Sequence, residues 1–110
     1  MKINIQQEDN YTNIRFDGAV DLSSSSDARK NIIEILEQIK NILIDLSLVN
    51  YIDSSGVASL VEGYQIAKKL SLKFGLVGIS DAAMGVLKLA RLDQVFPIYN
   101  SKEEYEKDCA

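Results

Sequence analysis

The segment Asn41-Ile42-Leu43-Ile44-Asp45-Leu46, followed by Tyr51-Ile52-Asp53-Ser54-Ser55-Gly56, decides the predicted fold. Its first part is a short run of β-branched residues and leucines, which is typical of a buried central strand. We predict a polar loop from Ser47 to Asp53 and a helix after it. The helix is indicated by apolar residues at helical spacing, which form one stripe: Val57, Leu60, Val61, Tyr64 and Ala67.

Two serines and a glycine therefore stand where a loop becomes a helix. The first backbone N–H groups of a helix have no partner within it, and the helix dipole places partial positive charge at that end. An anion is well accommodated there, including a phosphate group attached to a serine. The residues alone leave open whether Asp53, Ser54 and Ser55 only cap the helix, which such residues commonly do, or also carry a regulatory phosphate.

The segments before this one alternate between apolar and polar residues. Lys2 to Gln7 and Tyr11 to Val20 predict a β-hairpin with a turn at Glu8-Asp9-Asn10. Asp21 to Asp27 predicts a loop with a helix N-cap, and Ala28 to Lys40 predicts an amphipathic helix. The four serines from Ser23 to Ser26 fit capping residues, phosphoacceptors or a flexible spacer.

The segments after the central helix continue the alternation of strand and helix. Lys73 to Ile79 predicts a strand, in which Gly75 and Gly78 indicate a closely packed neighbour. A helix begins at Ser80-Asp81, an edge strand surrounds Pro97, and Ser101-x-x-Glu104 is a capping box for a short last helix.

The predicted order is β-β-α-β-α-β-α-β-α, in one domain spanning residues 1–110. Alternating strands and helices imply an α/β fold with a mixed, mostly parallel sheet, to which the N-terminal hairpin adds an antiparallel edge. Four helices complete the expected fold.

The composition excludes several classes of function. The 110 residues are 46% hydrophobic and 25% charged, with a net charge of −4, which disfavours general binding to nucleic acid or anionic lipid. The chain has no histidine and a single cysteine, Cys109, so histidine-based catalysis and thiolate zinc sites are excluded. It contains no apolar run of about 20 residues and no apolar leader, so we expect a cytoplasmic protein without membrane insertion. We predict no cofactor and no metal.

The quoted residues resemble the signature of STAS domains, found in anti-sigma factor antagonists and in sulphate transporters. The resemblance lies in the strand from Asn41 to Leu46, in Asp53-Ser54-Ser55-Gly56, and in Gly18-Ala19-Val20-Asp21 before the first helix. It runs from about Ile3 to Glu104 and implies the STAS fold. One departure is that Gly56 is followed by Val57-Ala58, where sigma regulators of the family often have a hydrophobic residue and a second glycine.

The resemblance implies a function in bacterial partner switching and transcription regulation. In antagonists of this type, the serine that directly follows the aspartate, here Ser54, is phosphorylated by a serine kinase that is also the anti-sigma factor; Ser55 is the alternative acceptor. Asp21 would lie beside it. The expected partner-binding residues are Asp21, Asp53, Ser54, Ser55, Gly56, Val57 and Ser59. The implied protein is not an enzyme.

Other functions remain possible from the sequence. An accessory subunit of an ABC-type lipid or other transporter would use the same helix to bind its partner constitutively. Asp21 and Asp53 could form a catalytic carboxylate pair, but no activating base accompanies them. A nucleotide-binding module lacks the phosphate-loop glycines. Tyr51 and Tyr64 are either interface anchors or packing residues.

Overall fold

A computed structural model describes residues 1–109 and contains one five-stranded mixed sheet. The strands lie in the same order in space as in the sequence: β1 (Lys2–Gln7), β2 (Thr12–Val20), β3 (Ile42–Ile52), β4 (Phe74–Val77) and β5 (Ile98–Tyr99). β1 is antiparallel to β2, and all other neighbours are parallel. The predicted hairpin and mostly parallel sheet are confirmed.

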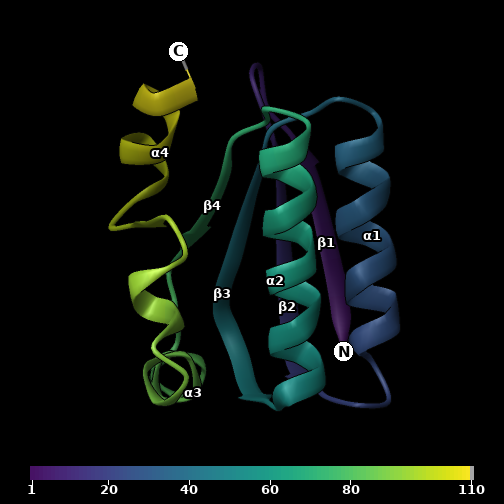
Figure 1. Cartoon of the computed structure of the whole chain (residues 1–110), viewed down its shortest axis with the longest axis vertical. Helices are drawn as coiled ribbons and strands as arrows, with labels where there is room; N and C mark the ends of the chain where they lie inside the picture. Colours follow the sequence, from purple (N-terminus) through teal and green to yellow (C-terminus); the bar gives the residue numbers. More distant parts are fainter. Residues whose placement is uncertain (110) are drawn as a thin grey trace.

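The helices follow the predicted order. They are α1 (Ser25–Glu37), α2 (Ser54–Lys69), α3 (Asp81–Leu89) and α4 (Lys102–Cys109). A short 3-10 helix at Leu92–Gln94 was not predicted. Helix α1 begins three residues earlier than Ala28, because the serines form its first turn. Figure 1 shows α1 and α2 side by side over one face of the sheet.

The predicted polar loop from Ser47 to Asp53 is wrong, because β3 extends to Ile52. Parallel pairing with β2 continues along the whole strand, from Thr12 beside Ile42 to Val20 beside Ile52, with two irregularities in register. The polar residues in this part lie on exposed positions, whereas Val49 is buried. The long strand brings Asp53 to the end of the sheet at which β2 and β3 both have their carboxyl ends.

Two clusters of buried residues hold the sheet between its helices. The larger cluster lies under α1, α2 and α3 and includes Ile14, Phe16, Ile32, Leu36, Ile42, Ile44, Leu46, Leu60 and Leu87. The smaller one lies under α4, where Tyr105 is fully buried and donates a hydrogen bond to the Ile42 carbonyl at 2.8 Å. A Cβ atom on Gly75 would come within 2.7 Å of the Tyr105 ring, which confirms the predicted close packing there.

Candidate functional site

The start of α2 is organised by the Asp53 side chain. Its Oδ1 accepts hydrogen bonds from the backbone N–H groups of Ser55 at 3.0 Å and Gly56 at 3.1 Å. The Ser55 hydroxyl donates to the same oxygen at 2.5 Å. The predicted cap is therefore confirmed, with Asp53 as the N-cap residue.

The two candidate phosphoacceptors differ in accessibility. Ser54 is the first residue of α2 and its side chain is exposed to solvent. Ser55 is half-buried, and its hydroxyl is engaged by Asp53. A modifying enzyme would therefore reach the Ser54 hydroxyl more easily than the Ser55 hydroxyl.

Gly56 fixes the position of this helix end against the sheet. A Cβ atom at this residue would lie 2.4 Å from the Val20 carbonyl oxygen and 2.7 Å from Cγ1 of Ile52. Both distances are far below ordinary van der Waals contact. The backbone of α2 can therefore approach the ends of β2 and β3 only because residue 56 has no side chain.

The loop after β2 is joined to the start of α2. The backbone N–H of Leu22 donates to Oδ2 of Asp53 at 3.1 Å. Within the loop, Oδ1 of Asp21 accepts from the Ser23 N–H at 3.0 Å and from the Ser23 hydroxyl at 2.7 Å. The predicted site residues Asp21 and Asp53 thus lie on adjoining loops at the carboxyl ends of β2 and β3.

An open hollow of about 510 Å³ lies between these loops, lined by Asp21, Leu22, Ser23, Tyr51 and Asp53. Two apolar side chains border it, because Leu22 is 81% exposed and Tyr51 is 55% exposed. Leu22 was not predicted as a site residue, although a leucine within a polar run was a usable signal. Tyr64, the other proposed anchor, instead packs against Phe74 and Phe96.

The carboxylates of Asp21 and Asp53 are both held in the charged form. Hydrogen bonding by the Ser55 hydroxyl is the main cause that lowers the pKa of Asp53 from 3.8, and the backbone N–H groups of Gly56, Ser55 and Leu22 add to it. The Ser23 hydroxyl is the main cause that lowers the pKa of Asp21 from 3.8, although the Asp53 charge opposes this shift. The site is therefore negative at neutral pH.

This cap predicts a pH dependence of stability. Because the pKa of Asp53 is lower in the folded state than the ordinary 3.8, its contribution is present above that value and is lost as pH falls through the folded-state pKa. In urea titrations, we expect the loss of stability below pH 3.8 to be smaller in Asp53→Asn than in the native chain. If the free energy of unfolding fell equally with pH in both proteins, the role of the charged cap would be contradicted.

The serines from Ser23 to Ser26 form an ordered turn and the start of α1. Ser24 is buried; its hydroxyl accepts from the Asp21 N–H at 2.9 Å and donates to the Ala19 carbonyl at 2.8 Å. These contacts fit the capping and turn interpretation of this run better than a flexible spacer.

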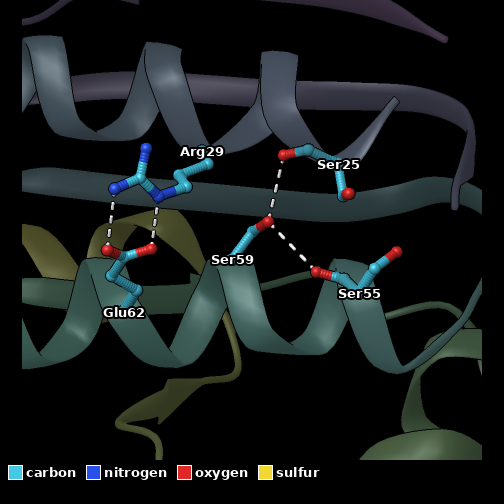
Figure 2. Close-up of polar contacts among 5 residues, drawn as sticks. All are labelled: Ser25, Arg29, Ser55, Ser59 and Glu62. Carbon is cyan, nitrogen blue, oxygen red and sulfur yellow. Dashed lines mark hydrogen bonds and ion pairs between the residues drawn. The ribbon is translucent and has the colours of Figure 1, made fainter. Parts of the chain in front are cut away.

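Three of the predicted partner-binding residues lie inside the fold. Gly56, Val57 and Ser59 are buried, because this side of α2 packs on α1 and the sheet. As Figure 2 shows, the Ser59 hydroxyl lies between the two helices, 3.0 Å from the Ser25 carbonyl oxygen and 3.1 Å from the Ser55 carbonyl oxygen. The Ser59 side chain therefore joins α1 to α2, and its contact with a partner stays a prediction.

Ser59→Ala tests this structural role. We expect the free energy of unfolding to fall by about 1 kcal/mol, because the hydrogen bond between the helices is lost while a small side chain is kept. Chemical denaturation measures the change. An unchanged stability together with weaker partner binding would show that Ser59 contacts the partner rather than stabilising the helix pair.

Comparison with known proteins places this geometry in a family. The family model for the STAS domain matches residues 2–105. The chain belongs to the STAS domain family. An anti-sigma-B factor antagonist of Bacillus subtilis is 22% identical to this STAS chain over 103 residues, which are 94% of each protein.

Solved STAS structures show the same fold. An anti-sigma-factor antagonist domain protein from Planctomyces limnophilus is 28% identical, with a TM-score of 0.79 over 93% of this chain and 92% of that one. The Bacillus cell fate determinant SpoIIAA in its phosphorylated form is 16% identical, with a TM-score of 0.74 over 96% of this chain and 98% of that one. Within residues 1–109, no helix is both long and apolar enough to cross a membrane.

Proposed function

We propose that this STAS protein is a cytoplasmic anti-sigma factor antagonist, which binds a serine kinase that is also an anti-sigma factor. It acts by binding rather than by catalysis, and phosphorylation of Ser54 ends the binding. The observation that carries this proposal is that Ser54 is exposed at the start of α2, directly after Asp53, which lines the hollow between the two joined loops. Relatives named as anti-sigma factor antagonists support the same function.

The proposed docking surface combines apolar contact with two fixed charges. Leu22 and Tyr51 offer exposed apolar area, and Asp21, Ser23 and Asp53 line the same hollow with polar groups. Gly56 and Val57 are buried in the first turn of α2, so they would position that turn rather than offer exposed area to a partner. A partner with an apolar patch and basic side chains at its rim would complement this arrangement.

Phosphate on Ser54 would change binding without changing the fold. The N–H groups of Ser55 and Gly56 are already hydrogen-bonded to Asp53, so the phosphate need not disturb the cap. It would add about −1.5 to −2 charges at pH 7 beside two carboxylates that are already ionised. A partner packed over this end would have to desolvate that charge, which is costly unless a cation pairs with it.

Affinity capture followed by incubation with ATP tests the proposal. The native protein would serve as bait, and mass spectrometry would identify both the captured partner and the phosphorylated residue. We expect a protein with a kinase-type ATP-binding fold and phosphate on Ser54. Ser54→Ala should still capture this partner without accepting phosphate, whereas Ser55→Ala should be phosphorylated normally.

Two results would contradict the proposal. Phosphate on Ser55 in the native protein, with Ser54 unmodified, would show that Ser54 is not the phosphoacceptor. Capture of a transporter ATPase or permease, with affinity unaffected by Ser54→Asp, would support the accessory transporter subunit instead.

A further inference from the structure

The outer edge of β1 is an unpaired strand edge. Strand β1 is the first strand of the sheet and pairs only with β2 on its inner side. Among residues 1–109, no other backbone group hydrogen-bonds to its outer side. Five of its six residues are exposed. Exposed strand edges offer rows of free N–H and C=O groups to another strand.

The pairing with β2 determines which backbone groups are free. The Glu8 N–H donates to the Tyr11 carbonyl at 2.8 Å, so Glu8 and Tyr11 form a hydrogen-bonded pair. In an antiparallel ladder, hydrogen-bonded and non-hydrogen-bonded pairs alternate along the strand. The backbone groups of Lys2, Asn4 and Gln6 therefore point towards β2, and those of Ile3, Ile5 and Gln7 point outwards.

Apart from Lys2 at its first position, this edge lacks the features that usually prevent strand pairing. Proteins protect exposed edges with prolines, bulges, or charged residues within the strand. From Ile3 to Gln7 the sequence is Ile-Asn-Ile-Gln-Gln, without a proline or a charge. The register between β1 and β2 is regular throughout, and the Ile5 side chain is 48% exposed.

The charges at the two ends of β1 favour one orientation of a second strand. Lys2 is basic and exposed at one end. At the other end Asp9 is acidic and exposed, and it follows Glu8, which already pairs with Lys102 of the same chain at 2.7 Å. A parallel copy of β1 would place like charges together. An antiparallel copy would place Lys2 of each chain beside the acidic end of the other.

We propose that two copies of this chain pair through β1, antiparallel about a two-fold axis at Ile5, to form a continuous ten-stranded sheet. In this register, Ile5 lies opposite Ile5 of the second copy, Ile3 lies opposite Gln7, and Lys2 lies opposite Glu8. The three outward-facing residues of each copy form hydrogen-bonded pairs, which share about six backbone hydrogen bonds. The exposed Ile5 side chains meet at the axis, where cross-strand apolar pairs are stabilising.

Sedimentation equilibrium on the native protein and on Ile5→Pro tests the pairing. The Ile5 N–H faces outwards, so proline removes a bond between copies and none between β1 and β2. We expect the native chain to reach twice the monomer mass as its concentration rises, and Ile5→Pro to remain a monomer. Ile5→Val keeps the N–H and a β-branched side chain, so it should behave like the native chain. A native chain that is still monomeric at about 1 mM would overturn the proposal, and so would a dimer that persists in a folded Ile5→Pro.

Cysteine crosslinking tests the register independently of proline. In a Cys109→Ser background, Ile5→Cys places two thiols across the axis with Cα atoms about 5.5 Å apart, within disulfide range. Gln7→Cys is the matched control, because its two copies would be more than about 13 Å apart. We expect mild oxidation to crosslink Ile5→Cys at least tenfold faster than Gln7→Cys. Equal rates would overturn the register.

Discussion

Gly56→Ala is expected to lower the free energy of unfolding by about 1–3 kcal/mol or more. The added methyl group has no room, because the nearest atom belongs to the backbone of the sheet. The new Cβ would meet the Val20 carbonyl oxygen, which belongs to the backbone of β2. The start of α2 would have to move away from the sheet. Urea denaturation measures the loss, and partner binding should weaken with it because the start of α2, which carries Ser54, is displaced.

Gly85→Ala is the matched control for this substitution. Gly85 lies inside α3, and beyond its chain neighbours and the backbone of its own helix no atom comes within 4 Å of a Cβ atom built there. Alanine should therefore stabilise the protein by about 0.5–1 kcal/mol through its higher helix propensity. If both substitutions changed stability equally, the close approach at Gly56 would not be what positions α2.

Ser54→Glu is expected to weaken partner binding by on the order of 100-fold while leaving the fold intact. The carboxylate would lie at an exposed helix start, where negative charge is tolerated by the helix dipole. Burying it under a partner beside Asp21 and Asp53 would cost several kcal/mol. Isothermal titration with the captured partner measures the affinity, and circular dichroism checks the fold.

Ser71→Asp provides the control for added charge. Ser71 is exposed just beyond the other end of α2 and has a φ of 57°, a conformation that aspartate tolerates. It should leave the affinity for the partner unchanged. An equal loss of affinity in both variants would point to a general charge effect rather than to a site at Ser54.

The predictable parts of the fold were those in which apolar residues recur with a clear helical or strand period. Helices α1 and α2 carried apolar stripes, and β1 and β2 alternated, so their types and order could be predicted. The end of β3 could not, because it is exposed on one side and its pairing with β2 is irregular. Polar residues such as Ser47 and Asn50 suggested a loop, although Leu48, Val49, Tyr51 and Ile52 also suit a strand.

The site was predictable in its local chemistry and not in its long-range contacts. An aspartate before two serines and a glycine indicated the cap that Asp53 forms. The hydrogen bond from Leu22 to Asp53 joins residues 31 positions apart, and the contact of Ser59 with Ser25 joins residues 34 positions apart. Such contacts depend on how α1 and α2 pack, which no local pattern encodes.

We propose that one phosphate on Ser54 decides whether the partner binds. The most direct test of this proposal is the affinity of the partner for two homogeneous preparations, unmodified and phosphorylated at Ser54, measured by titration calorimetry in the same buffer. We predict tight binding of the unmodified protein and a loss of at least about 100-fold on phosphorylation. Equal affinities, with both preparations folded, would contradict the proposed switch.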